Sequence, residues 1–146
     1  MLLLRTSPAV TESYDAVFPV LHGRNGEDGT VQGLFELAGA PLIGCDTLPS
    51  ALCMDKDRAH RLAALAGIEV PKSFAFSHGA DPKEIERCAG LLGWPLFVKP
   101  VRAGSSFGIS KVTAPKELSA AVKLAFLYDS EILLEEAIPG FEVGCA

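Results

Sequence analysis

The sequence has no hydrophobic run long enough to cross a membrane and no concentration of positive charge. The apolar run after Met1 covers only residues 2–4, which is too short for a signal peptide or a membrane span. The net charge of -5, without a basic stripe, argues against a nucleic-acid surface. We therefore expect a soluble, cytoplasmic protein that binds neither nucleic acid nor a membrane.

The cysteines form neither a CxxC pair nor a spacing typical of metal ligands. We expect them to be reduced thiols in the protein core, and we predict no metal ligand in this chain. The four are Cys45, Cys53, Cys88 and Cys145. A chain of 146 residues, 49% hydrophobic and 21% charged, has the size and composition of a folded globular domain.

The apolar pattern changes several times between strand-like and helix-like spacing. Short apolar runs predict strands over residues 15–21, 41–44, 96–99, 109–112 and 131–136. Apolar residues at helical spacing predict helices over residues 31–38, 47–54, 56–66 and 82–92, and one from 113 or 115 to about 125. Pro19 argues against a central position for the first strand. The order indicates a mixed α/β fold without internal repeats.

Two of these helices carry specific expectations. Asp81 can cap the helix over residues 82–92, with Glu84 completing a capping box and Gly93 ending it. In the helix over residues 56–66, the expected buried face consists of Ala59, Leu62, Ala63 and Ala66.

A loop rich in glycine and serine, residues 102–108, lies between two of the predicted strands. Its backbone N–H groups and hydroxyls can surround phosphate oxygens, and Lys99 can add a charge-assisted hydrogen bond of roughly 1.5–3 kcal/mol. The segment lacks the GK[ST] ending and the following helix of a Walker A loop. A plain β-hairpin with a flexible tip explains the segment as well as a phosphate loop does.

Three further segments carry polar residues in positions suited to ligand binding. HGRNGEDG (residues 22–29) places a histidine after a predicted strand, MDK (54–56) places a lysine at a helix boundary, and EEAIPGFE (135–142) follows the last strand. Each segment also has a simpler interpretation: a polar turn that caps a helix, a solvated lysine, and a charged loop.

In order, the segments HGRNGEDGTVQGLFELAGAPLIGCD, SALCMDKDRAH, FVKPVRAGSSFGISKV and EILLEEAIPGFEVGCA resemble the D-alanine–D-alanine ligases of the ATP-grasp superfamily. The segments GSSFG and FEVGCA resemble sequences of the vancomycin-resistance ligases of the D-alanine–D-serine and D-alanine–D-lactate type. The resemblance extends from about Asp15 to Ala146. It implies an ATP-grasp fold, with the end of an amino-terminal Rossmann-like α/β domain over residues 1–54 and a central ATP-grasp domain over 55–146, incomplete at the carboxyl end.

The resemblance implies an ATP-dependent ligase of peptidoglycan precursor synthesis. Such an enzyme converts D-alanine to D-alanyl phosphate and joins it to D-alanine, D-serine or D-lactate. The implied cofactors are ATP and Mg²⁺, and the implied full-length enzyme is a homodimer. The residues expected near the first D-alanine, and hence in catalytic positions, are His22 and Ser105.

The resemblance also implies the contacts of the ATP phosphates. Lys56 and Lys99 would hold the phosphates, and the loop would close over the γ-phosphate. The loop residues implied there are Gly104, Ser105 and Ser106. We expect Gly108 to permit this closure, so that a valine there slows turnover without destabilising the core.

The base and the sugar of the nucleotide would be bound after the last strand. Glu135, Glu136 and Ile138 would contact the adenine through side chain or backbone, and Glu142 would bind the ribose hydroxyls.

The sequence departs from the family at both ends. The family's amino-terminal glycine-rich segment, with its substrate-binding glutamate, has no counterpart before Asp15. Its magnesium-binding acids, a catalytic arginine and the loop that selects the second substrate have no counterpart up to Ala146. We therefore expect a central part of a ligase that is inactive in isolation. The alternatives are another ATP-grasp carboxylate–amine ligase and a nucleotide-binding module without catalysis.

Overall fold

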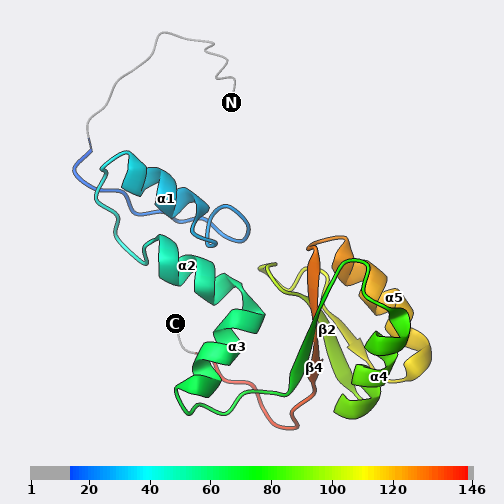
Figure 1. The fold of residues 1–146 in the computed structure, drawn as a ribbon. Helices are drawn as coiled ribbons and strands as arrows, with labels where there is room; N and C mark the ends of the chain where they lie inside the picture. The colour runs from blue at the N-terminus through cyan, green and yellow to red at the C-terminus, as the bar shows by residue number, and fades with distance from the viewer. Residues whose placement is uncertain (1–13, 145–146) are drawn as a thin grey trace.

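The computed structural model describes residues 14–144, which form two groups of elements. Figure 1 shows one group of helices in succession on one side, and a sheet with its own helices on the other. The first group is α1 (Thr30–Leu37), α2 (Thr47–Met54) and α3 (Lys56–Leu65). The second is β1 (Ser73–Ser77), α4 (Pro82–Leu92), β2 (Leu96–Pro100), β3 (Ser110–Val112), α5 (Pro115–Phe126) and β4 (Glu131–Glu136).

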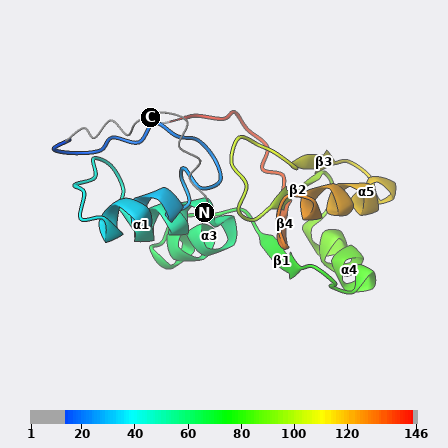
Figure 2. The same cartoon turned by 90° about the horizontal axis from the view of Figure 1, so that it is seen from above.

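The sheet has the order β1-β4-β2-β3, and every neighbouring pair is antiparallel. Helices α4 and α5 cover one of its faces (Figure 2). The core lies between these helices and that face. Its buried residues are Ile85, Ala89, Leu96, Val98, Val112, Leu118, Ala121, Ala125, Ile132 and Leu134. Each large aliphatic side chain buried here contributes about 1.5–3 kcal/mol.

The opposite face of the sheet is more polar. Successive strand residues point to opposite faces, so Phe97 and Lys99 lie away from the core. Directly paired residues share a face, which places Lys111 and Glu135 beside Phe97, and Leu133 beside Lys99. This face therefore brings two lysines, an aromatic ring and a carboxylate together.

The strands predicted over residues 15–21 and 41–44 are not regular strands. Only Val17 pairs with Leu42, in an isolated parallel bridge. The bridge consists of Val17 N–H donating to Pro41 O at 2.8 Å and Ile43 N–H donating to Val17 O at 2.9 Å. Pro19 lacks an N–H group, which accounts for the failure of the pairing to continue beyond Val17.

A strand that the pattern analysis missed, β1, pairs with β4 along its full length. Phe74 and Phe76 pair with Leu134 and Ile132, so both aromatic rings lie on the core face of the sheet. The alternation of SFAFS between Pro71 and Gly79 was the available signal. The predicted strands over residues 96–99, 109–112 and 131–136 are confirmed as β2, β3 and β4.

The five predicted helices are confirmed to within one or two residues at each end. At α4, the Asp81 carboxylate accepts a hydrogen bond from Lys83 N–H at 3.0 Å, as expected of an N-cap. Glu84 does not complete the capping box, because its carboxylate is paired with Arg87 at 2.6 Å. Within the described residues, no helix combines the length and the hydropathy needed to cross a membrane.

Two expectations about burial are wrong. Cys88 is buried, but Cys45 and Cys53 are exposed; Cys145 lies outside the described residues. The face predicted to be buried on α3 is largely open, and Leu62 is 49% exposed. The main helix contacts of α2 are with α1 and α3, and the sides of α2 and α3 that carry Cys53 and Leu62 remain open.

Truncation of a side chain in the core should lower the stability of the protein. Leu134 is 0% exposed in the core, so Leu134→Ala should lower the free energy of unfolding by about 2–5 kcal/mol. Leu127 is 79% exposed, and Leu127→Ala should change stability little. Urea unfolding of both variants measures this difference. Equal losses would contradict the position of the core.

Candidate functional site

The first residue of α3 is bound to the base of the glycine- and serine-rich loop. The Asp55 side chain caps α3 by accepting a hydrogen bond from Arg58 N–H at 2.9 Å. The next residue, Lys56, donates from its backbone N–H to Val101 O at 3.2 Å. Its ammonium donates to Ala103 O at 2.8 Å and to Val101 O at 3.3 Å. Lys56 is therefore fixed at the start of the loop and is not a solvated surface lysine.

Burial lowers the pKa of Lys56 below its ordinary value of 10.5, and the nearby charge of Lys99 lowers it further. The carboxylates of Asp129, Glu135 and Asp55 act in the opposite direction. Two half-buried ammonium groups that repel each other are stabilised by an anion placed between them. The charge arrangement is thus suited to an anionic ligand.

Lys99 is paired with a buried carboxylate on the neighbouring strand. Its ammonium lies 2.5 Å from Glu135 Oε1, and the Glu135 side chain is 9% exposed. The same ammonium lies 5.4 Å from the centre of the Phe97 ring. His60, from α3, approaches the other carboxylate oxygen with Nε2 at 3.8 Å. Helix α3 and the polar face of the sheet therefore meet at Glu135.

The loop, residues 102–108, lies within the turned connection between β2 and β3, residues 101–109. Ser105 and Ser106 adopt left-handed backbone angles, with φ of 49° and 57°, and both side chains are exposed. Phe107 N–H donates to Gly104 O at 3.2 Å, and the Phe107 ring stacks on Tyr128 with centroids 6.1 Å apart. The connection joins the two strands of a β-hairpin, as the first interpretation expected, and its two serines are exposed, as a phosphate loop would require.

The His22 turn lies against this loop. A Cβ atom added to Gly104 would lie 3.0 Å from Gly23 Cα, so a side chain there would require the neighbouring backbone to move by a few tenths of an ångström. Glu27 stabilises the turn by accepting a hydrogen bond from Gly23 N–H at 2.5 Å. The ring of His22 is 79% exposed, with Nδ1 3.9 Å from Glu27 Oε1. The fold thus brings residues 22–29 next to the loop, about 80 positions away in sequence.

An open groove runs between this turn, α2 and the loop. It is lined on the loop side by Lys56 and Ala103 and on the turn side by Gly26 and Glu27. Gln32 also lines the groove; it is 6% exposed, and its side-chain amide donates to Gly26 O at 2.9 Å.

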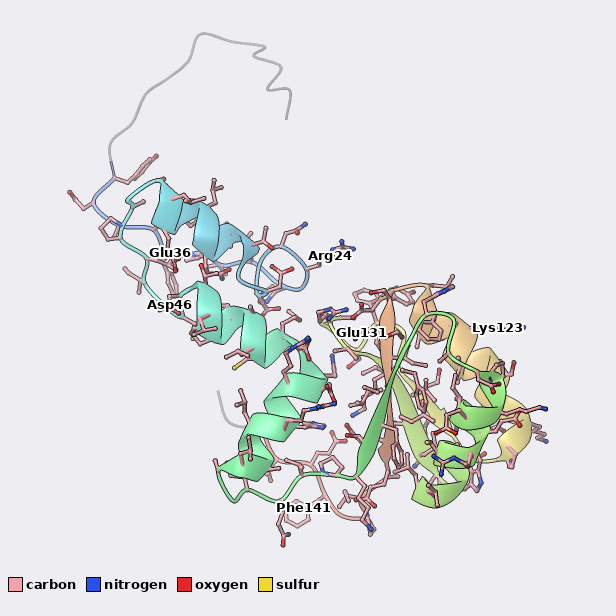
Figure 3. All side chains as sticks on the ribbon, viewed as in Figure 1. Arg24, Glu36, Asp46, Lys123, Glu131 and Phe141 are labelled. Atoms are coloured by element: carbon pink, nitrogen blue, oxygen red, sulfur yellow. The ribbon has the colours of Figure 1, made fainter. Side chains whose placement is uncertain are left out.

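Of the residues expected to bind the adenine and the ribose, only Glu135 has a described contact with one of the two lysines. The Glu136 carboxylate accepts a hydrogen bond from Lys72 N–H at 2.7 Å, at the entrance to β1. Ile138 is 65% exposed, and Glu142 is also exposed. The neighbouring Phe141 projects away from the sheet in Figure 3.

An arginine that the sequence analysis did not select holds the base of the loop. Arg102 donates to Asp129 at 2.8 Å, to Glu131 at 2.6 Å and to Asp55 at 3.3 Å, and its backbone N–H donates to Asp129 at 2.6 Å. Glu131 is labelled at the start of β4 in Figure 3. These acids lie far from Arg102 in the sequence, so only the fold identifies the cluster.

A magnesium site does not fit the described residues. Between residues 14 and 144, no group of three or more His, Cys, Asp or Glu side chains is close enough to hold a metal ion.

Two models of known protein families match the sequence. The one described as "D-ala D-ala ligase C-terminus" matches residues 62–146, and the one described as "D-ala D-ala ligase N-terminus" matches residues 3–45.

Individual relatives agree with these matches. Vancomycin B-type resistance protein VanB of Enterococcus faecalis is 49% identical over 146 residues, which cover 100% of this chain and 41% of VanB. A D-alanine–D-alanine ligase of Caldicellulosiruptor bescii is 45% identical over 150 residues, with 100% and 41% covered. The crystal structure of the VanG D-Ala:D-Ser ligase from Enterococcus faecalis superposes with a TM-score of 0.82 at 62% identity, over 87% of this chain and 37% of that one. The chain spans about two fifths of the length of these relatives.

The loop geometry contradicts the expectation that a valine at position 108 would leave the core intact. Gly108 has a φ of 71°, and an added Cβ would lie 2.6 Å from Tyr128 Cδ2 and 2.8 Å from Pro100 Cγ. Gly108→Val should therefore lower the free energy of unfolding through backbone strain and, because of these close contacts, by about a further 1–3 kcal/mol. Gly39 is the matched control, because its φ of 66° is similar and nothing lies within 4 Å of an added Cβ. Equal destabilisation by Gly39→Val and Gly108→Val would contradict the packing of the loop.

The Arg102 cluster predicts a pH dependence of stability. Burial alone would raise the pKa of Asp129, but hydrogen bonds from Arg102 and from Glu131 N–H outweigh it and hold the pKa below 3.8. A lowered carboxyl pKa contributes stability that is present above pH 3.8 and is lost as the pH falls through the folded-state value. Asp129→Asn should be less stable than wild type at pH 7, and the difference should narrow below pH 3.8. Urea unfolding across this range gives the two curves; a constant difference would contradict the assigned cause.

Proposed function

This chain belongs to the D-alanine–D-alanine ligase family, and on that premise we propose that the whole protein joins D-alanine to a second D-amino or D-hydroxy acid at the expense of ATP. Its fold is the ATP-grasp fold expected from the sequence. The proposed boundary between the amino-terminal and central domains lies near residues 54–55, and the two matched segments, 3–45 and 62–146, leave it between them. The product would be a peptidoglycan precursor.

The main observation that supports the proposal is that Lys56 and Lys99 lie near each other beside the loop. The pKa of Lys56 is lowered by burial and by Lys99, so an anion between the two lysines relieves an existing repulsion. We propose that this anion is the triphosphate of ATP. The exposed Ser105 and Ser106 would then contact the γ-phosphate when the loop closes over it.

The proposed reaction has two steps. A carboxylate oxygen of D-alanine attacks the γ-phosphorus, the bond from this phosphorus to ADP breaks, and D-alanyl phosphate forms. The amine or hydroxyl of the second substrate then attacks the acyl carbon and phosphate leaves. Both steps place negative charge on phosphoryl oxygens, and acyl phosphate must be protected from water.

The chain's own groups match these needs. Lys56 and Lys99 neutralise phosphoryl oxygens, and the loop with Gly104 and Ser105 excludes water. His22 is proposed near the D-alanine, because the Gly23 backbone contacts Gly104 and so places the histidine's turn at the loop.

The base and ribose are proposed to lie along the end of β4. Glu135 and Glu136 are the last two residues of β4, and Ile138 and Glu142 are exposed in the segment that follows. Glu142 would accept hydrogen bonds from ribose hydroxyls, and the backbone near Ile138 would meet the adenine edge. Magnesium enters no step here, because the described residues do not offer it a site.

That the 146-residue chain forms no dipeptide by itself remains part of the proposal. Purified chain is incubated with ATP, Mg²⁺ and D-alanine, and phosphate release is followed. Nucleotide binding without D-alanine-dependent release is the expected result. Release that depends on D-alanine would contradict it.

The proposal predicts that Lys99 is needed for ATP binding. Lys99→Met removes a charge-assisted contact and should weaken ATP binding to the chain by about 10- to 100-fold, or roughly 1.5–3 kcal/mol. Lys123→Met makes the same change of charge on the exposed side of α5, away from the loop, and should leave affinity unchanged (Figure 3). Isothermal titration calorimetry at high protein concentration measures both. Equal ATP affinity in the two variants would contradict the phosphate site.

A further inference from the structure

Glu135 is a buried carboxylate with only one of its oxygens satisfied. Oε1 accepts from the Lys99 ammonium at 2.5 Å, whereas Oε2 is buried and has no hydrogen-bond partner. A buried carboxylate oxygen without a partner costs free energy, so its surroundings should hold a donor for it.

His60 is the group placed to be that donor. Its Nε2 atom lies 3.8 Å from Glu135 Oε2, which is beyond hydrogen-bond distance but within reach of a small rotation of the ring. Its Nδ1 atom is also buried without a partner, so no hydrogen bond at that atom holds the ring in its present orientation. Lys56, the other nearby cation, is occupied by the carbonyls of Val101 and Ala103.

The position of His60 follows from the sequence KDRAH. His60 comes four residues after Lys56 on α3, so the two side chains lie on the same face, one turn apart. The capping of α3 at Asp55 and the Lys56 contacts fix this face toward the sheet. The imidazole is therefore directed at β4 by the same contacts that place Lys56 at the loop.

Under the proposed function, Lys99 has two anionic partners, the Glu135 carboxylate and the phosphates of ATP. In the structure its ammonium is bound to Glu135, but ATP binding requires it at the phosphates. If Lys99 turns to the phosphates without a replacement, Glu135 is left as an unpaired buried charge, which is strongly destabilising.

We propose that His60 is a positioning residue of the nucleotide site: it turns its Nε2–H onto Glu135 Oε2, replaces Lys99 there and frees the Lys99 ammonium for the triphosphate. This inference rests on the proposed function, and it adds a residue that touches no phosphate yet controls phosphate affinity. It follows that His60 should affect the affinity for ligands whose phosphates attract Lys99, and not the affinity for ligands without phosphate.

The test compares two substitutions and three ligands. His60→Leu removes the donor, whereas His60→Gln keeps an N–H near the position of Nε2. His60→Leu should weaken binding of ATP and of inorganic tripolyphosphate by about tenfold or more, while adenosine binding stays unchanged. His60→Gln should restore most of the phosphate affinity. His78→Leu removes an exposed histidine whose ring contacts Phe126 and should have no effect.

A double-mutant cycle with Glu135→Gln separates positioning from packing. With a neutral amide at position 135, no buried charge needs a new partner, so His60→Leu should have no further effect on tripolyphosphate binding. An effect of equal size in both backgrounds, or an equal loss for adenosine, would show that His60 acts through packing and would overturn the inference.

When these binding measurements are made by isothermal titration calorimetry, failure of the inference can be told apart from failure of the proposed function. Wild-type chain that binds neither ATP nor tripolyphosphate would refute the proposed nucleotide site, and the role of His60 with it. Wild-type chain that binds both, with His60→Leu behaving like His78→Leu, would refute the role of His60 alone.

Discussion

The contact between the start of α3 and the base of the loop is the interaction on which the arrangement of the site depends. Lys56 donates to the carbonyls of Val101 and Ala103, and Asp55 accepts from Arg102. Helix α2 packs on α1 and α3, the sheet packs on α4 and α5, and this junction joins the two groups at the site (Figures 1 and 2). Because it also fixes the face of α3 that meets Glu135, it positions the helical and the sheet residues of the site together.

Several cations around this junction are paired with carboxylates of the same chain. An anionic ligand must therefore replace some of these existing contacts. Lys99 is neutralised by Glu135, and Arg102 by Asp129 and Glu131. An entering polyanion would therefore meet Lys56, whose ammonium is bound to backbone carbonyls, and would take Lys99 out of its existing pair with Glu135. Such exchange keeps buried charges paired in both states, which is the less costly way to build a half-buried anion site. Affinity then depends on residues behind the lysines as much as on the lysines themselves.

Much of the fold was predictable because local signals agreed with it. The capping residues, the glycines after helices and the apolar periodicity located α1 to α5, and short apolar runs located β2, β3 and β4. β1 was missed because its two phenylalanines alternate with small residues, and the strand over residues 15–21 failed because Pro19 interrupts its pairing. Sequence segments singled out Lys56, Lys99 and the loop as candidates, whereas the Arg102 cluster and the approach of His60 to Glu135 involve acids that only the fold brings near.

The central claim is that the polar face of the sheet, the start of α3 and the loop form one nucleotide site. Amide NMR spectra of the chain titrated with ATP test it most directly. The account predicts chemical-shift changes at Lys56, His60, residues 99–108 and the end of β4, with α4 and the outer side of α5 unaffected. Changes confined to α4 and α5, or none at millimolar ATP, would contradict it.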